Sequence, residues 1–459
     1  MDERGILESN RRIGRAEYLL RRAYLKCMPR FLGLVLGNAC NIDCRHCYQE
    51  KNADNLLGPR EIGGELRHEF LSLCPYLTGL RVQGGEALAY RGFRDLVEDL
   101  ASVVGRSLLS VSTNGTLIDE EWAEVMVRLP FASLTVSIDG ATPATFARLR
   151  RGAELTGVLA NVERLRRWKR KLNSNRPELD SFFVVMRSNF REIPAYLELM
   201  HQHGFEEVAL QTLEVNHANS KREPLLEEDE RITGRRDIAD LYELVGAALP
   251  RARRCFRKVR VSGLKVLFEK HGYDTAFLRE LEYGLYPETE GLEDPSGDGS
   301  FELCPNPWTT LFVSENGNVH LCFLSEPVGN LCEAPLVEIW NSPRAVAKRL
   351  RMSRGAYLAS GCSPGWCEHR EGMIPAPANP PLKRTLLQDL SPAVPYPAID
   401  TDPALAGLGA VRRMVAENGR RLFEGEAVVR AMDEEFQRMR RSLLVRAAAR
   451  IARMLRPCG

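Results

Sequence analysis

Short apolar runs alternate with longer amphipathic stretches along the first half of the chain. The short runs are rich in Val, Leu, Ile and Phe, which is typical of buried strands. The stretches between them repeat apolar residues at helical spacing. The pattern predicts strands over residues 31–36, 80–83, 108–112, 133–138, 181–186 and 207–211, and helices over residues 93–103, 120–127, 158–168 and 194–201.

Strands that alternate with helices indicate βαβ units and a parallel sheet. Right-handed crossovers would curl six such units into an open barrel over residues 31–217. The expected fold class is therefore α/β, with a partial (β/α)6 TIM-like barrel. In such barrels, reactive groups lie on the loops that follow the C-terminal ends of the strands.

The remaining segments carry different patterns. Residues 1–30 predict one amphipathic helix packed on the barrel, and residues 218–300 predict a helical bridge followed by a flexible loop. Residues 373–459 begin with a proline-rich linker and end in helices. The last of these, over residues 440–455, is basic and amphipathic; we expect it to pack on the protein rather than on a membrane surface.

Composition narrows the classes of protein that fit. The chain has 459 residues, 44% of them hydrophobic, and a net charge of +2, which is too balanced to indicate nucleic acid as the main partner. The first residues include acids and no apolar core, so we expect a cytoplasmic protein without a signal peptide. In that compartment the twelve cysteines favour metal ligands or buried thiols over disulfides.

Three cysteines follow the first predicted strand with the spacing C-x3-C-x2-C: Cys40, Cys44 and Cys47. Three thiolates on one loop can bind three irons of a [4Fe–4S] cluster and leave the fourth iron open for chemistry. A tetrahedral zinc site completed by His46 is the alternative.

Polar motifs follow the next strands in order. Strand 80–83 runs into Gln83-Gly84-Gly85-Glu86, and the next strands end in Ser112-Thr113-Asn114-Gly115 and Ser137-Ile138-Asp139-Gly140. Arg150 follows the last of these motifs. Taken singly, each motif also fits an ordinary turn, and Arg150 also fits a solvated helix face.

This ordered set resembles the radical S-adenosylmethionine (SAM) superfamily. The resemblance implies that SAM binds the open iron through its amino and carboxylate groups, and that His46 packs beside the cluster. It implies a SAM site with Glu86 near the amino group, Asp139 near the ribose and Arg150 near the carboxylate. The full implied set is Gln83, Gly84, Gly85, Glu86, Ser112, Asn114, Ser137, Asp139, Arg150 and Leu210, the last beside the adenine.

Glu214 and His217 follow the sixth strand at the mouth of the predicted barrel. These two residues are candidates for substrate contact or proton transfer. Ordinary solvated loop residues are the alternative.

A second group of cysteines lies over residues 301–372. A predicted hairpin would bring Cys304 and Cys322 together, and Cys362 and Cys367 form a pair on one loop, which makes four thiolates in a closed site. The region resembles the SPASM or shortened twitch domain, so we expect a small α+β extension. The last pair has four intervening residues where that family usually has two. We expect a single auxiliary [4Fe–4S] cluster without Cys332; a structural zinc, or loss of the site, is the alternative.

The resemblance implies reductive cleavage of SAM to methionine and a 5′-deoxyadenosyl radical that abstracts a substrate hydrogen. An electron donor such as flavodoxin or ferredoxin would supply the electron. We expect a carbohydrate or aminocyclitol type of natural product as substrate, in an oxidation, dehydration or epimerisation; peptide maturation is the alternative. A zinc-stapled, non-catalytic binding protein is the alternative from another class.

Overall fold

The computed structural model describes residues 3–47, 64–213, 230–281, 303–323, 325–353 and 360–362. The strands are β1 Phe31–Val35, β2 Asp43–Cys44, β3 Gly79–Gln83, β4 Leu109–Thr113, β5 Phe131–Ser137, β6 Arg150–Arg151, β7 Glu178–Val185, β8 Glu207–Thr212, β9 Lys258–Ser262, β10 Thr310–Val313, β11 Asn318–His320 and β12 Gly329–Asn330. The helices are α1 Glu3–Leu19, α2 Gly64–Leu73, α3 Phe93–Val103, α4 Glu120–Arg128, α5 Pro143–Leu149, α6 Leu155–Lys171, α7 Ile193–Gln202, α8 Arg235–Cys255, α9 Leu264–Lys270, α10 Asn306–Thr309, α11 Leu336–Trp340 and α12 Pro343–Met352.

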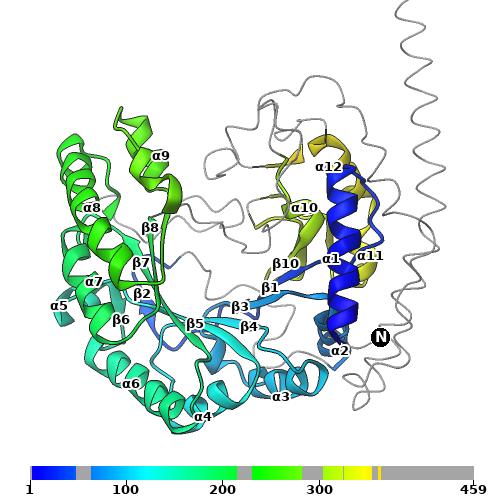
Figure 1. Ribbon diagram of the computed structural model, residues 1–459, viewed down its shortest axis with the longest axis horizontal. Coiled ribbons are helices and arrows are strands. Elements are labelled where there is room, and N and C mark those ends of the chain that lie inside the picture. The colour runs from blue at the N-terminus through cyan, green and yellow to red at the C-terminus, as the bar shows by residue number, and fades with distance from the viewer. Residues whose placement is uncertain are drawn as a thin grey trace, which may run out of the picture.

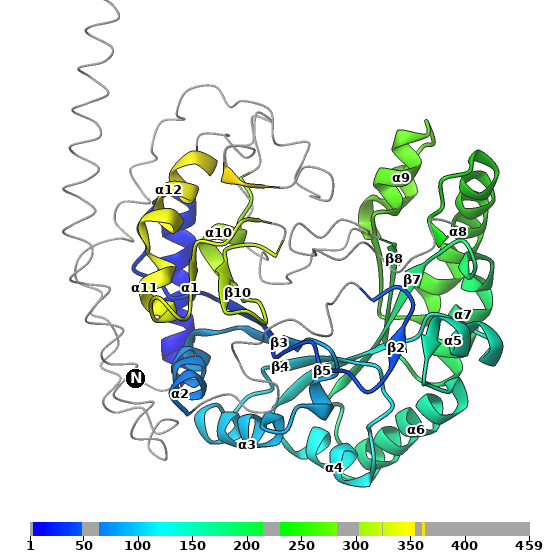
Figure 2. The same ribbon diagram turned by 180° about the vertical axis from the view of Figure 1, so that it is seen from behind.

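Ten of these strands form one curved sheet in the order β12-β11-β10-β1-β3-β4-β5-β7-β8-β9. All neighbouring strands from β10 to β9 are parallel, whereas β11 pairs antiparallel with both β10 and β12. Helices α3, α4, α6, α7 and α8 lie along the convex side of the curve, and α1, α11 and α12 stand beside β10 (Figures 1 and 2). The C-terminal ends of the central parallel strands therefore share one edge.

Buried and less buried side chains alternate along the strands, and the buried ones form the face on which the helices pack. In β3, Leu80 and Val82 are buried while Arg81 between them is only half-buried, because successive side chains point to opposite faces. In α3, Phe93, Leu96, Val97 and Leu100 form a buried stripe. Apolar faces of sheet and helices thus meet in one core.

The six predicted strands and four predicted helices are confirmed, and so is the α/β class. The helical bridge predicted within residues 218–300 also contains a strand, at residues 258–262. These residues form β9, which adds a further parallel strand beside β8. The prediction for the end of the chain, residues 373–459, lies outside the described residues.

The C-terminal extension continues the barrel sheet. Strand β10 pairs in parallel with β1, so that Phe31 lies opposite Thr310 and Leu34 opposite Val313. The hairpin predicted around Glu315–Asn318 joins β10 to β11. The extension is therefore attached to the strand that precedes the cysteine loop.

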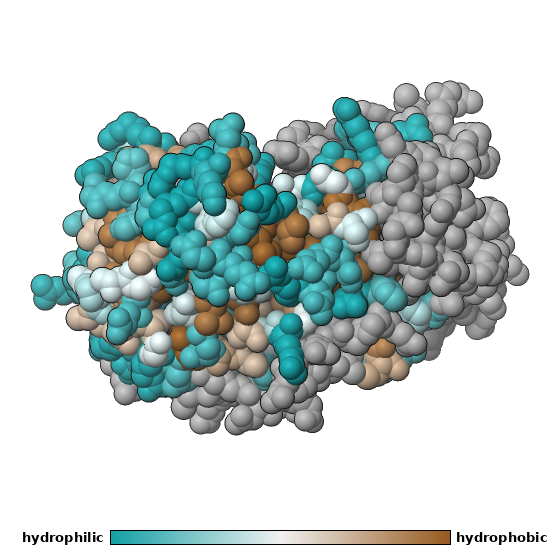
Figure 3. All heavy atoms as spheres, turned by 90° about the horizontal axis from the view of Figure 1, so that it is seen from below, coloured by the Kyte–Doolittle hydropathy of each residue, from teal (hydrophilic) through white to brown (hydrophobic). Residues whose placement is uncertain are grey.

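Polar side chains dominate the surface seen in Figure 3, with small separate apolar areas. The arginines of the basic run 164–171 share two glutamates. Glu120 pairs with Arg164 and Arg167, and Glu163 pairs with Arg166 and Arg170. Within the described residues, every helix is too short or too polar to cross a bilayer.

Candidate metal and cofactor centre

The cysteine loop leaves the C-terminal end of β1 and is fixed by a two-residue ladder. Cys44 pairs with Arg150 and Asp43 with Arg151 in the antiparallel β2–β6 pair. The Arg45 amide extends this contact by donating to the Leu149 carbonyl at 2.9 Å. One side of the loop is therefore bound to the segment that follows α5.

The glycine pair after β3 holds the other side of the loop. Gly84 has φ of +150°, a conformation that disfavours other residues. The Gly85 amide donates to the Gly37 carbonyl at 2.8 Å, and a Cβ on Gly85 would lie 2.0 Å from the Ala39 carbonyl oxygen. The glycines therefore admit the backbone of the cysteine loop.

Glu86 joins the ends of β3 and β4 from a buried position. Its carboxylate accepts hydrogen bonds from Thr113 Oγ1 at 2.8 Å, from the Asn114 amide at 2.7 Å and from the Leu88 amide at 3.1 Å. Burial raises the pKa of Glu86, and these donors oppose that shift. The structure thus places Glu86 as a clamp between strand ends, with its oxygens already engaged.

Asn114 reaches the cysteine loop directly. Its Nδ2 lies 2.8 Å from Asn41 Oδ1 and 3.8 Å from Cys40 Sγ, while Asn41 Nδ2 donates to Thr116 Oγ1 at 2.8 Å. The Asn–Gly turn after β4 therefore positions the first cysteine of the loop.

Asp139 is fully buried after β5 and pairs with an arginine and a histidine. Its Oδ2 lies 2.6 Å from Arg150 Nη2 and 3.0 Å from His46 Nε2, and its Oδ1 accepts from the Val184 amide at 2.7 Å. Burial acts to raise the pKa of Asp139, but Arg150 and His46 outweigh it and lower the pKa to about 2. Arg150 Nη1 also lies 3.8 Å from Cys44 Sγ.

The three thiols of the loop influence one another. Burial raises the pKa of Cys44 to about 11, with Cys47 and Cys40 adding to the rise and Arg150 opposing it. Burial also raises the pKa of Cys40, again with a contribution from Cys47. All three are free thiols close enough to interact electrostatically.

Three other residues of the implied SAM site lie at or near the C-terminal ends of their strands. Gln83 ends β3, where its carbonyl accepts from the Leu36 amide at 3.0 Å, and Ser112 Oγ accepts from Arg81 Nη2 at 3.0 Å. Ser137 ends β5 half-buried, on the same face as Phe182 and Ala209.

Leu210 is not placed as the sequence analysis expected. It pairs with Phe183, whose ring packs against Tyr196 of α7 with centroids 4.6 Å apart. Leu210 therefore lies on the helix-covered face, opposite the face of Ser137. Strand alternation decides this outcome, because Ala209 takes the inner position. Glu214 and His217 lie outside the described residues.

Two cysteines of the second group, Cys322 and Cys362, lie near each other after β11. Ser325 forms a bridge with Cys362, and the Ser325 amide and hydroxyl both donate to the Cys322 carbonyl, at 3.1 and 2.9 Å. Burial raises the pKa of Cys362, and Cys322 adds to the rise. Cys304 is buried before α10, Cys332 is exposed, and Cys367 lies outside the described residues.

The residues at the first loop fit a cluster. Three free thiols share one short loop, the glycine pair leaves no room for a side chain beside it, and His46 Nδ1 is buried without a hydrogen-bond partner. Within the described residues, no three ligating side chains gather around a single-ion site. The cysteines of a four-iron cluster each bind a different iron, so they need not converge on one point. His46 Nε2 pairs with Asp139, so Nδ1 is the ring nitrogen left without a partner.

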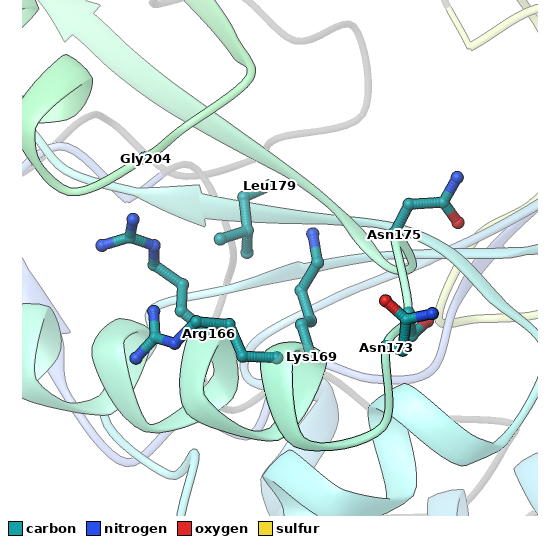
Figure 4. Close-up of a pocket in the computed structure, with 8 residues that line it drawn as sticks. Arg166, Lys169, Asn173, Asn175, Leu179 and Gly204 are labelled. Carbon is teal, nitrogen blue, oxygen red and sulfur yellow. The ribbon is translucent and has the colours of Figure 1, made fainter.

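A basic pocket lies away from this centre. It has a volume of about 590 Å³ and is lined by Arg166, Lys169 and Arg170 of α6, by Asn173 and by Leu179 near the start of β7 (Figure 4). Lys169 Nζ is held by the Pro177 carbonyl at 2.7 Å and by Glu206 at 3.0 Å. The pocket thus belongs to the N-terminal ends of the strands, opposite the cysteine loop.

Sequence reasoning missed the contacts that hold the loop. The β2–β6 ladder has two residues on each strand, so no periodic pattern marks it. Asn189 was likewise missed: its Nδ2 donates to the carbonyls of Asp139 and Val184 at 3.0 and 2.8 Å. The only local signal was its position directly after a predicted strand.

A parallel barrel with three cysteines after its first strand defines a cluster-binding α/β protein. Residues 34–174 match the model of the radical SAM superfamily, and residues 304–367 match SPASM, an iron–sulfur cluster-binding domain. Residues 34–174 therefore form a radical SAM-type domain and residues 304–367 a SPASM-type domain. These domains imply a [4Fe–4S] cluster, SAM and an auxiliary iron–sulfur site.

Known proteins resemble parts of this chain. The GTP 3′,8-cyclase of Erythrobacter litoralis is 28% identical over 198 residues, which are 42% of this chain and 57% of that protein. The GTP 3′,8-cyclase of Mycolicibacterium smegmatis is 30% identical over 136 residues, 28% of this chain and 37% of that protein. The chain thus spans about half the length, or less, of these curated relatives.

Solved structures share the fold. Streptococcus suis SuiB bound to S-adenosylmethionine has a TM-score of 0.51 at 14% identity, covering 72% of this chain and 69% of that one. SuiB bound to its precursor peptide SuiA has a TM-score of 0.50 at 13% identity, covering 71% and 67%.

Proposed function

We propose that the protein is a radical SAM enzyme that binds its catalytic [4Fe–4S] cluster through Cys40, Cys44 and Cys47. One observation carries the proposal: the loop of three free thiols is clamped between Gly85 and the β6 strand. When bound there, the cluster and SAM supply a one-electron cleavage that yields methionine and a 5′-deoxyadenosyl radical for hydrogen abstraction. An external one-electron donor of the flavodoxin or ferredoxin class would supply the electron that this cleavage consumes.

The residues of the chain hold and orient this site. Asn114 contacts the Cys40 side, Arg150 contacts the Cys44 side, and both are fixed by buried carboxylates. Ser137 and Gln83 at the strand ends offer polar groups for the bound SAM. The chain thus supplies preorganised polar groups around the thiols.

For the substrate we propose a polar, hydroxyl-rich molecule of the carbohydrate or aminocyclitol type. The face of the sheet away from the helices carries a row of polar residues in register: Ser112, Thr135, Asp180 and Glu207. Arg260 adds a cation that lies 3.1 Å from Glu207 and 3.6 Å from Asp180. A peptide is the second candidate, because its backbone is also polar and SuiB, which binds a precursor peptide, shares the fold.

Anaerobic purification tests the proposal. We expect absorption near 410 nm and about eight irons per chain for two four-iron clusters. Cys44→Ala should abolish the formation of 5′-deoxyadenosine from SAM and dithionite, because one iron loses its ligand. Cys255→Ala, which replaces a half-buried thiol of α8, is the matched control and should leave that product unchanged. A colourless protein with one equivalent of zinc would instead support the non-catalytic alternative.

Isotope transfer separates the two substrate classes. Deuterated sugars or aminocyclitols, and deuterated peptides, are offered in turn to the loaded enzyme. The true class should transfer deuterium into 5′-deoxyadenosine. Transfer from peptides alone would contradict the carbohydrate assignment and leave the radical SAM assignment standing.

A further inference from the structure

Lys348 of α12 is a buried cation near the second group of cysteines. Lys348 is only 2% exposed, and its Nζ donates a hydrogen bond to the Ser360 carbonyl at 2.7 Å. A buried ammonium is costly unless a negative charge faces it. A carbonyl is neutral, so the burial of Lys348 calls for an anion nearby.

The anionic groups that act on Lys348 are the thiolates of Cys362 and Cys322 and, third, the carboxylate of Glu326. Ser360 lies two residues before Cys362, and the Ser325 bridge connects Cys362 to the Cys322 carbonyl. Both cysteines interact electrostatically with the Lys348 ammonium, as does the exposed Glu326. The cation therefore lies within the field of two predicted cluster ligands.

The first cysteine loop provides a useful contrast. There Arg150 also approaches a thiol, at 3.8 Å from Cys44, but Asp139 pairs with it at 2.6 Å and neutralises it. Lys348 has no carboxylate hydrogen bond among the described contacts. Cys362 and Cys322 are therefore its strongest anionic partners, ahead of Glu326.

We propose that Lys348 is a positioning residue of the auxiliary iron–sulfur site that offsets the negative charge of the thiolate-bound cluster and raises its reduction potential. The inference rests on the proposed function, because it requires an auxiliary cluster. The reduced cluster carries one more negative charge than the oxidised one, so a neighbouring cation favours the reduced state. Net charge around a cluster is one of the factors that set its potential.

The test uses full-length protein carrying Cys40→Ala and Cys44→Ala, so that only the auxiliary cluster reports. Lys348→Met removes the charge and keeps an unbranched stem, whereas Lys348→Arg keeps the charge. A redox titration with dithionite, followed by electron paramagnetic resonance, measures the potential. Lys348→Met should shift the reduced-to-oxidised ratio about tenfold toward the oxidised form, about 59 mV for one electron.

Arg344→Met is the matched control, because it removes an exposed cation from the same helix and should leave the potential unchanged. A Lys348→Met protein that keeps its iron and its potential overturns the inference. If Lys348→Met is folded but holds no iron, retention of iron by Lys348→Arg supports the charge role, and loss of iron from both overturns it. A protein without iron before any change at Lys348 overturns the auxiliary site itself, while 5′-deoxyadenosine formation by the wild type still tests the catalytic cluster.

Discussion

At the scale of single residues, the glycine pair after β3 supports the cysteine loop. Gly84 and Gly85 lie against the backbone of Gly37 and Ala39, so their lack of side chains sets how closely β3 approaches the loop. The backbone carbonyls of Gly37 and Ala39 then accept hydrogen bonds from the amides of Gly85 and Glu86. The Gly84-Gly85 motif is therefore needed to build the cysteine loop itself, whether or not a ligand is bound.

Gly85→Ala tests this role. The added Cβ would lie 2.0 Å from the Ala39 carbonyl oxygen, a distance that forces the loop to move. We expect the protein to stay folded and to lose most of the iron bound at the first loop, measured as about four irons per chain fewer than wild type.

Gly246→Ala in α8 is the control for this change, because its Cβ would meet no atom within 4 Å. It should keep all iron and gain about 0.5–1 kcal/mol of stability, as alanine is favoured over glycine in a helix. Full iron content in Gly85→Ala would show that the loop tolerates the displacement.

At the scale of elements, the β2–β6 ladder joins the cysteine loop to the segment after α5. Asp139 stabilises this junction by pairing with Arg150 of β6 and His46 of the loop. A residue at the end of β5 thus fixes the orientation of two other elements. Removing one partner of such a buried pair leaves the other charge without compensation.

Asp139→Asn should lower the free energy of unfolding by about 3–5 kcal/mol, since Arg150 and His46 then lose their buried anion. The pKa of Asp139 is lowered to about 2, so its stabilising effect is present above the ordinary carboxyl value of 3.8 and is lost as the pH falls toward 2. Urea unfolding at several pH values should show this acid dependence in the wild type and not in the variant.

Asp43→Asn is the matched control, because Asp43 pairs with Arg151 on the same ladder but both side chains are about half exposed. An exposed pair contributes only about 0–1 kcal/mol. Equal losses in the two variants would contradict a special role for Asp139.

The elements differ in how far the sequence predicts them. The main parallel strands were predictable because each is long enough to show an apolar pattern between amphipathic helices. Strand β9 alternates Lys258, Val259, Arg260 and Val261, which is a strand pattern, but the charged helical segments around it favoured a helical interpretation. The resemblance implies that Leu210 lies beside the adenine, but register with β7 puts its side chain on the helix-covered face, and no local sequence pattern gives that register.

The candidate site divides in the same way. The residue types and their order after successive strands predicted the cysteine loop and the motifs around it. Their partners were not predictable, because the contacts of Glu86 with Thr113 and of Asp139 with Arg150 depend on how the strands align. Charged residues expected to meet SAM are consequently engaged with the protein itself.

At the scale of the whole molecule, the N-terminal segment joins the barrel to the extension. Tyr18 of α1 donates to the Leu303 carbonyl, Trp308 Nε1 donates to the Arg22 carbonyl at 2.6 Å, and Trp340 Nε1 donates to the Cys27 carbonyl at 2.8 Å. Residues far apart in the sequence thus share one buried interface. Both cysteine sites depend on it, because β1 follows directly after this segment.

Arg349 of α12 lies at the centre of this interface, fully buried. Its guanidinium donates to the carbonyls of Pro307 at 2.7 Å and Ala23 at 3.1 Å, and it stacks on Trp340 at 4.3 Å from the ring centroid. Hydrogen bonds from a charged donor contribute about 1.5–3 kcal/mol each, and acceptors left unpaired add a penalty.

Arg349→Met should therefore lower the midpoint of urea unfolding by an amount equivalent to about 3 kcal/mol or more. Arg344→Met removes an exposed cation from the same helix and should change stability by no more than about 0.5 kcal/mol. Because the interface supports both sites, iron content should fall with stability in Arg349→Met when each is followed across the same urea series. If the extension unfolded while the first loop kept its iron, the N-terminal segment would not couple the two sites, and the barrel would hold its cluster independently.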